Sequence, residues 1–112
     1  MRLINQTKGT VLAENFFLAD SILKRIKGLL GKASFNKGQA LIIKPCNSIH
    51  TFFMRFPIDV LFMDKNNKVI QAIPGIKPFK LTSIYFQADH VIELPSGTIK
   101  DSLTSVGDKL SY

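Results

Sequence analysis

The chain has 112 residues, of which 46% are hydrophobic and 21% charged, and this length and composition predict one globular domain over residues 1–112. The single cysteine, Cys46, excludes an internal disulfide and a cysteine-rich metal site, so we expect a cytoplasmic location. The longest apolar runs have four residues, far fewer than the ~20 that a transmembrane helix needs.

The positive charge is concentrated in the first half of the chain. Fifteen Lys and Arg residues against eight Asp and Glu residues give a net charge of +7. Residues 1–56 hold nine basic and two acidic residues, whereas residues 57–112 hold six of each. Such a basic half can bind nucleic acid or anionic lipid, although a basic face more often only keeps a protein in solution.

The first elements in chain order are two strands and a helix. Residues 2–7 and 10–18 predict short strands, with a Lys-Gly turn between them. Residues 20–31 predict an amphipathic helix, because their apolar side chains recur at the spacing of one helical face. Asp20 can cap the first turn of this helix, and Gly31 can end its last turn.

The middle of the chain predicts three further strands. Residues 39–44 are rich in strand-forming side chains and are followed by Pro45. Residues 58–63 and 68–73 predict a hairpin, because the asparagines between them tolerate the left-handed backbone of a tight turn. The turn-forming residues from Pro74 onward predict an interruption of the second strand.

The last third of the chain predicts a strand at residues 90–94, a helical turn at 99–103 and a final strand at 109–112. Many short strands and one helix, without alternation of strand and helix, predict a mostly β (α+β) fold. We expect a small closed or partly open β-barrel of short strands with the amphipathic helix packed over it.

The segment from Cys46 to Asp59 combines His, Cys, Arg and Asp with aromatic residues. Polar groups among apolar residues are costly to bury unless they are paired, so this grouping marks a candidate site. If residues 49–55 form a strand, alternation places His50 and Met54 on one face and Arg55 on the other.

Motifs for bound cofactors are lacking in the sequence. There is no glycine-rich phosphate loop and no H-E-x-x-H pair. A zinc site would require His50, His90 and a carboxylate to converge from distant strands. We therefore expect no metal and no cofactor.

Each polar residue of the segment permits two interpretations. His50 is either a base, because imidazole suits proton transfer near neutral pH, or a structural side chain. Asp59 is either a buried acid or an acceptor that holds turn amides or pairs with Arg55. Cys46 and His50 suggest a thiol nucleophile with its base, but an extended chain would hold them ~13 Å apart, so their contact needs an intervening turn.

The run Ser48-Ile-His-Thr-Phe-Phe-Met-Arg-Phe-Pro-Ile-Asp-Val-Leu-Phe-Met-Asp64 resembles the signature of the domain-of-unknown-function 192 family, a group of uncharacterised prokaryotic proteins. Residues 27–31, 90–97 and 106–110 match the family in the same order. The resemblance implies a compact, mostly β fold with a barrel-like core and one helix. It implies no particular reaction.

Three functions from different classes agree with these residues. The first is a small binding module for an anionic small molecule or a peptide segment, with candidate ligand contacts from His50, Thr51, Met54, Arg55, Asp59 and Lys44. Arg55 is the expected anchor, because a guanidinium group binds a carboxylate or phosphate with two hydrogen bonds. The second is a hydrolase or transferase with His50 and Asp59 as a proton-transfer pair, and the third is a nucleic-acid-associated basic protein. We expect a monomer or homodimer without a membrane span.

Overall fold

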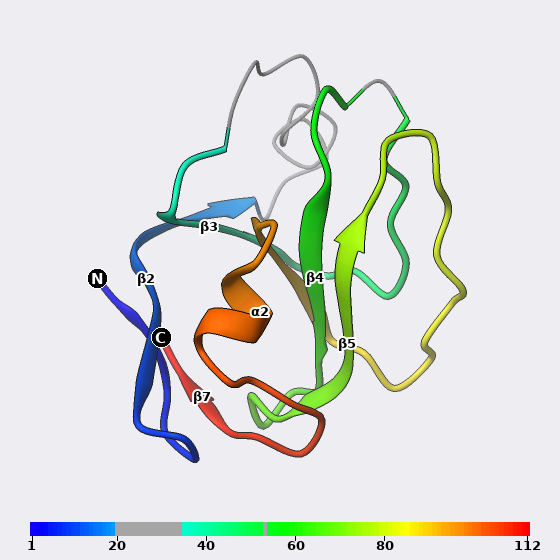
Figure 1. Cartoon of the computed structure of the whole chain (residues 1–112). Coiled ribbons are helices and arrows are strands. Elements are labelled where there is room, and N and C mark those ends of the chain that lie inside the picture. Colours follow the sequence, from blue (N-terminus) through cyan, green and yellow to red (C-terminus); the bar gives the residue numbers. More distant parts are fainter. Residues whose placement is uncertain (20–34, 53) are drawn as a thin grey trace.

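The computed structural model describes residues 1–19, 35–52 and 54–112 (Figure 1). The strands in these residues are β1 (Leu3–Asn5), β2 (Thr10–Ala19), β3 (Gly38–Ile43), β4 (Ile58–Met63), β5 (Val69–Ile76), β6 (His90–Pro95) and β7 (Leu110–Ser111), and the helix is α2 (Thr98–Asp101). The helix predicted over residues 20–31 lies outside the described residues. None of the described residues belongs to a helix long and apolar enough to cross a membrane.

The strands form one curled sheet in the order β5-β4-β6-β3-β2-β1-β7. β2 and β3 are parallel, and the other neighbouring strands are antiparallel. The two edges of the sheet meet at one end, where the Val69 amide donates to the Asp108 carbonyl oxygen (2.9 Å) and the Gly107 amide donates to the Val69 carbonyl oxygen (2.8 Å). The sheet is therefore a half-barrel, and the predicted mostly β, barrel-like fold is confirmed.

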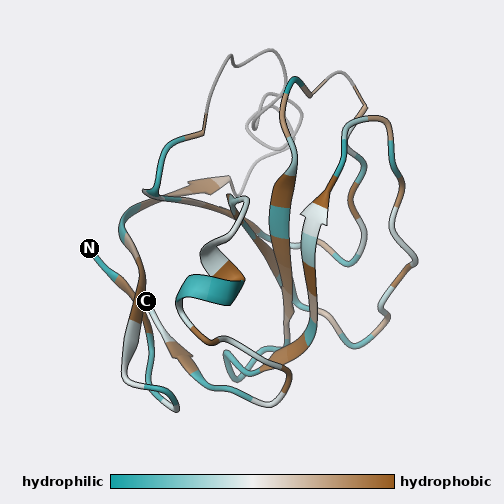
Figure 2. Cartoon of the chain, viewed as in Figure 1, coloured by the Kyte–Doolittle hydropathy of each residue, from teal (hydrophilic) through white to brown (hydrophobic). Residues whose placement is uncertain are grey.

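Both faces of the central strands are covered. Every residue of β4 and β6 is buried, and hydrophobic residues predominate along β4 (Figure 2). Because side chains alternate along a strand, Leu61 and Met63 join a core on the side of α2, whereas Val60 and Phe62 join a second core on the other face. Two long connections cover the second core: the first connection (residues 44–57, of which residue 53 is not described) and the second connection (residues 77–89).

The predicted hairpins are confirmed, because β1 pairs with β2 and β4 pairs with β5 in antiparallel register. The condition that residues 49–55 form a strand is not met by the described residues of this stretch, because the Met54 amide donates to the Thr51 carbonyl oxygen (3.2 Å) and closes a turn. One local prediction is wrong. β5 is not interrupted at Pro74, because the strand accommodates an extra residue as a bulge next to β4 and continues to Ile76.

Candidate functional site

Asp59 of β4 is a buried acceptor of backbone hydrogen bonds from two other elements. Its side chain is fully buried, and one carboxylate oxygen accepts the Gly75 amide (2.8 Å). The other oxygen accepts the amides of Gly97 (3.1 Å) and Ile99 (2.8 Å) at the start of α2. These charge-assisted hydrogen bonds tie α2 and the β5 bulge to β4, which agrees with the interpretation of Asp59 as an acceptor of turn amides.

Thr51 joins the two long connections. Its buried hydroxyl group donates to the Lys77 carbonyl oxygen (2.6 Å) and accepts the Lys80 amide (2.9 Å). Its own amide donates to the Lys80 carbonyl oxygen (2.9 Å), and the Thr82 amide donates to the Ile49 carbonyl oxygen (3.0 Å). The second connection is therefore held in place along residues 49–51.

His50 lies on the surface in a group with two apolar side chains. It is exposed, and its ring stacks on the Phe52 ring at a centroid distance of 5.1 Å and an interplanar angle of 25°. The backbone of His50 pairs with that of Leu81 in an antiparallel bridge, which places their side chains on the same side. Met54 does not share this exposed face, because the turn at residues 51–54 directs it into the second core.

The described residues form neither of the two His50 pairs that the sequence suggests. The Cys46 thiol group donates to the Ser48 carbonyl oxygen (3.0 Å). Both Asp59 oxygens accept backbone amides, and Asp59 is fully buried while His50 is exposed. The structure thus brings His50 together with Phe52 and Leu81 rather than with an acid or a thiol.

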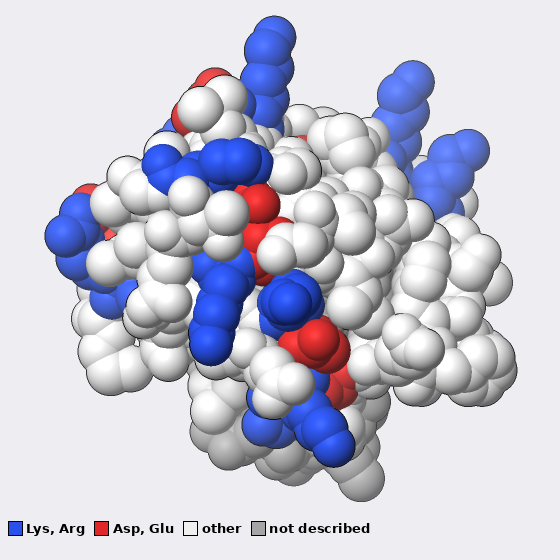
Figure 3. All heavy atoms as spheres, turned by 90° about the horizontal axis from the view of Figure 1, so that it is seen from below, with Lys and Arg blue, Asp and Glu red and all other residues white. Residues whose placement is uncertain are grey.

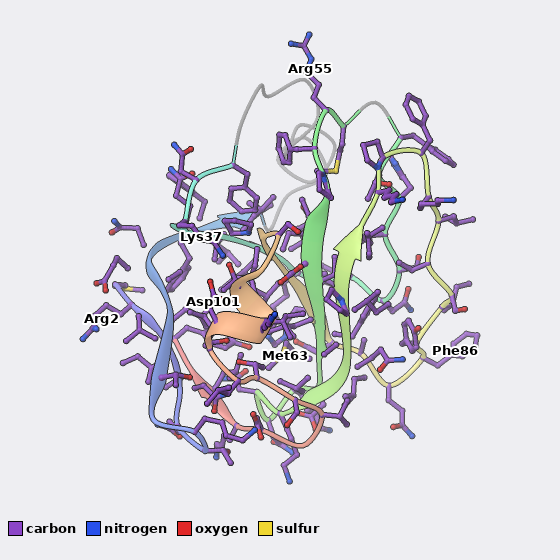
Figure 4. The ribbon with its side chains drawn as sticks, viewed as in Figure 1. Arg2, Lys37, Arg55, Met63, Phe86 and Asp101 are labelled. Carbon is purple, nitrogen blue, oxygen red and sulfur yellow. The ribbon has the colours of Figure 1, made fainter. Side chains whose placement is uncertain are left out.

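Lys44 and Arg55 carry charge on the surface of the first connection. Lys44 forms an ion pair with Asp89 (3.4 Å). Arg55 is exposed and points away from the sheet (Figure 4). Among the described residues, no ion pair joins Arg55 to Asp59. The six residues predicted to bind a ligand therefore do not converge on one pocket: three are buried in the fold, and three are at the surface.

Buried His90 links two partly exposed polar side chains, one of which belongs to the last residue, Tyr112. The two ring nitrogens of His90 contact the Asp89 carboxylate (2.9 Å) and the Tyr112 hydroxyl group. The hydrogen bond with His90 lowers the pKa of Asp89, whereas burial lowers the pKa of His90 and raises the pKa of Tyr112. Burial thus favours neutral His90 and Tyr112, and their contact fixes the last residue to β6.

Glu93 of β6 is a buried carboxyl group that the sequence analysis misses. It is 5% exposed and pairs with Leu41 on β3 and Val60 on β4, so its strand neighbours are apolar. The structure shows no hydrogen bond or ion pair from its side chain to a described residue. Burial raises its pKa to about 7. The only sequence signal is an acid inside an apolar strand.

Exposed apolar and basic side chains gather on the two long connections. We call this group the basic apolar surface; its members are His50, Phe52, Lys77, Lys80, Leu81, Ile84 and Phe86. Phe86 is 85% exposed, Leu81 70%, Ile84 54% and Phe52 39%. Phe86 points outward from the second connection (Figure 4). This amount of exposed apolar side chain in one region is typical of an interaction surface.

Basic residues predominate on the two connections, where the one acidic residue of the described part is Asp89, which pairs with Lys44. Residues 44–58 and 74–88 contain Lys44, Arg55, Lys77 and Lys80 and no Asp or Glu. Seen from below, charged side chains of both signs lie on the left and at the centre of this face, and its right side is largely uncharged apart from basic side chains at the upper edge (Figure 3). In the sequence, the sign of this surface is the acid-free run from Lys77 to Phe86, in which two lysines lie among apolar and polar residues.

One hollow lies among the described residues of the two connections. An open depression of about 290 Å³ is lined by Pro45, Cys46, Asn47, Ser48 and Ala88, none of which belongs to the basic apolar surface. Among the described residues, no three His, Cys, Asp or Glu side chains gather as they would around a metal ion. The apolar members of the surface therefore do not line this depression, and their large exposed fractions show that they protrude.

Comparison with known proteins finds similarity over nearly the whole chain. The family model described as "Uncharacterized ACR", DUF192, matches residues 3–112. A UPF0127 protein of Thermococcus sibiricus is 32% identical over 114 residues, which cover 98% of this chain and 73% of the relative. A UPF0127 protein of Pyrococcus abyssi is 33% identical over 116 residues, which cover 98% of this chain and 96% of the relative.

Two solved structures share the fold. A protein of unknown function from Novosphingobium aromaticivorans has a TM-score of 0.86 at 18% identity, covering 100% of this chain and 84% of that chain. A Sinorhizobium meliloti protein, described as a candidate transcription regulator, has a TM-score of 0.81 at 21% identity, covering 98% of this chain and 89% of that chain. At these identities the likeness concerns the fold alone.

Proposed function

Because the chain belongs to DUF192, a family of uncharacterised function, we propose a function from its own surface: it is a binding module that docks through the basic apolar surface onto an anionic and apolar partner. One observation carries this proposal. The four apolar members of the surface are exposed on two connections that contain basic residues and no acidic residue from 44 to 58 or from 74 to 88, before Asp89 ends the second connection. An anionic partner with apolar groups complements both properties.

The apolar side chains supply affinity. Burial of one Leu, Ile or Phe side chain contributes about 1.5–3 kcal/mol when it is complete. Leu81, Ile84 and Phe86 each keep more than half of their surface in water, so most of this contribution is still available to a complex. The loss of translational and rotational freedom on binding offsets part of it.

The hydrogen bonds of the second connection support the proposal, because they hold its backbone in place before a partner binds. Thr51 bonds to both ends of the Lys77–Lys80 turn. Farther along, the Tyr85 amide donates to the Asn47 carbonyl oxygen (2.9 Å), and the Tyr85 ring packs on Phe62 at a centroid distance of 4.4 Å. A preorganised surface loses less conformational entropy on binding.

The proposal assigns different tasks to the six predicted ligand contacts. His50 contacts the partner as part of the basic apolar surface, Arg55 carries positive charge on the same connection, and the charge of Lys44 is paired with Asp89. Thr51 and Met54 are buried beneath the surface, whereas Asp59 holds α2 and the β5 bulge elsewhere in the fold. This distribution favours binding over the alternative of proton transfer between His50 and Asp59.

The test compares decyl amphiphiles that differ only in the head group, decyl maltoside and decyltrimethylammonium, with decanoate, whose ten carbons include the carboxylate, each below its micelle concentration. Amide chemical shifts in NMR spectra report where each amphiphile binds. We expect decanoate to bind most tightly and decyltrimethylammonium least tightly, with shifts in residues 49–52 and 77–86. Equal affinities, or shifts located elsewhere, contradict the proposal.

A matched pair of variants locates the binding site. The double variant Leu81→Ser/Phe86→Ser removes two exposed apolar groups of the surface. The control Leu103→Ser/Val106→Ser removes groups of similar exposure, 65% and 58%, from the loop that follows α2. We expect at least about a tenfold loss of decanoate affinity in the first variant and unchanged affinity in the control. A titration with duplex DNA tests the nucleic-acid alternative, which predicts binding that weakens steeply with salt and persists in both variants.

A further inference from the structure

We infer that the partner of the basic apolar surface is the anionic face of a lipid bilayer; this inference rests on the proposed function. The protein would attach to the bilayer from one side, with Leu81, Ile84 and Phe86 at the level of the head groups. Lys77 and Lys80 would contact the phosphates. No helix of the described chain crosses the membrane in this arrangement.

The shape of the surface favours a bilayer over a folded partner or a peptide. Peptide-binding sites offer grooves or pockets that receive the side chains of the peptide. Here the apolar side chains belong to the protein and protrude, Phe86 with 85% and Leu81 with 70% of their surface exposed. The depression near them has a different lining. A bilayer interface is soft and accepts protruding apolar side chains without pockets that match them.

The order of residues along the second connection gives the surface an amphipathic character. Lys80 directly precedes Leu81, and Lys77 lies three residues earlier. Long lysine side chains can lie along an apolar surface with their ammonium groups in the head-group region. Acidic lipids attract such lysines, and the absence of Asp and Glu from residues 74–88 leaves this attraction unopposed within that stretch.

The direction of Tyr85 separates the exposed side chains from the core. Its ring packs on Phe62 in the second core, so its neighbours in the chain, Ile84 and Phe86, lie on the outside. The backbone pair of His50 and Leu81 adds the exposed Phe52 ring to the same side through its stacking on His50. The apolar groups are thus presented by a backbone that the sheet supports, and insertion requires no unfolding.

The experiment uses a single tryptophan as a reporter. The chain contains no Trp, so Phe86→Trp places one fluorophore on the surface, and Val106→Trp places one at an exposed control position. Each protein is titrated with vesicles of phosphatidylcholine alone and of phosphatidylcholine mixed with phosphatidylglycerol. For Phe86→Trp we expect a blue shift of the tryptophan emission with the mixed vesicles and quenching by brominated acyl chains. The emission of Val106→Trp should not change.

Two variants in the Phe86→Trp background separate the contributions of charge and apolar contact. Lys77→Gln/Lys80→Gln should lose about tenfold in affinity for the mixed vesicles and respond less to salt. Leu81→Ser should weaken binding to these vesicles at every salt concentration. A Lys77→Gln/Lys80→Gln variant that binds both vesicle types as the parent does would overturn the assigned role of the lysines.

The outcomes distinguish failure of this inference from failure of the proposed function. If decanoate binds the surface but the mixed vesicles leave the tryptophan emission of Phe86→Trp unchanged, the bilayer inference is wrong and the binding module remains. If an acidic amphipathic peptide shifts this emission and vesicles do not, the partner is a protein segment. If neither decanoate nor vesicles bind, both the inference and the proposed function are wrong.

Discussion

Replacing Glu93 by Gln should remove a strong pH dependence of stability. In the folded protein Glu93 is 5% exposed between apolar neighbours, and burial raises its pKa from 4.5 to about 7. In the unfolded chain the carboxyl group is in water and keeps its ordinary pKa. The folded state therefore holds the Glu93 proton over a pH range in which the unfolded state has lost it.

The sign and size follow from these two pKa values. Below pH 4.5 Glu93 is protonated in both the folded and the unfolded state, and the stability that its proton contributes is fully present. This contribution is lost as the pH rises to about 7. One proton of difference between the states changes the free energy of unfolding by about 1.4 kcal/mol per pH unit. Over this range, ionisation of Glu93 lowers the free energy of unfolding by about 3 kcal/mol in total.

The assay is urea unfolding of the wild type and of Glu93→Gln at several pH values between about pH 4 and pH 8. Gln has nearly the same shape as Glu and does not ionise. The free energy of unfolding of the variant minus that of the wild type should therefore be about 3 kcal/mol larger at pH 8 than at pH 4. Groups present in both proteins, such as Asp89 and Asp108 with their lowered pKa values, cancel in this comparison. Glu14→Gln is the control, because Glu14 is exposed on β2 and its replacement should change stability by less than about 0.5 kcal/mol.

A difference between the wild type and Glu93→Gln that stays constant with pH would refute this reasoning. It would mean that the carboxyl group gains in the folded state a partner or a water shell that compensates for its burial. Destabilisation of the variant at pH 8 alone would be the opposite of the expected sign. It would show that ionised Glu93 stabilises the fold.

Two further substitutions compare a residue that supports the fold away from the basic apolar surface, Asp59, with one that holds the second connection, Thr51. Asp59→Asn should cost about 3 kcal/mol in urea unfolding, because an amide cannot accept all three backbone hydrogen bonds, and decanoate affinity measured on the folded variant should not change. Thr51→Val should lower the free energy of unfolding by about 1–3 kcal/mol. Hydrogen exchange at the Lys80 amide should become faster than this loss of stability alone explains, whereas exchange in β4 should increase only as much as the loss explains. Unchanged Lys80 exchange would show that Thr51 does not hold the second connection.

Several elements of the fold could be predicted from local sequence alone. The β4–β5 hairpin follows from alternating apolar residues and a turn at Asn67, whose left-handed backbone (φ 63°) suits asparagine. The strand at residues 90–94 has the apolar character of a chain that is buried on both faces. These predictions hold because alternation and turn chemistry act between residues that are close in sequence.

The distribution of the candidate site residues depended on contacts between distant segments. Aromatic and β-branched residues in 49–55 favour a strand, but Thr51 bonds to the second connection and the chain turns. Asp59 is adjacent to apolar residues in either interpretation, and only the position of α2 shows that its carboxylate accepts amides. Spacing along the chain cannot reveal partners that lie tens of residues away.

The mostly β class, the main hairpins, the net charge of +7 and the family follow from the order of the residues alone. Which hydrophobic residues are buried, and which acidic side chains are enclosed, follows from the packing of distant segments. Phe62 and Phe86 belong to the same residue type, yet one is fully buried and the other is 85% exposed. Hydrophobicity is a property of each side chain, whereas burial depends on which distant segments cover it, and that depends on how the whole chain packs.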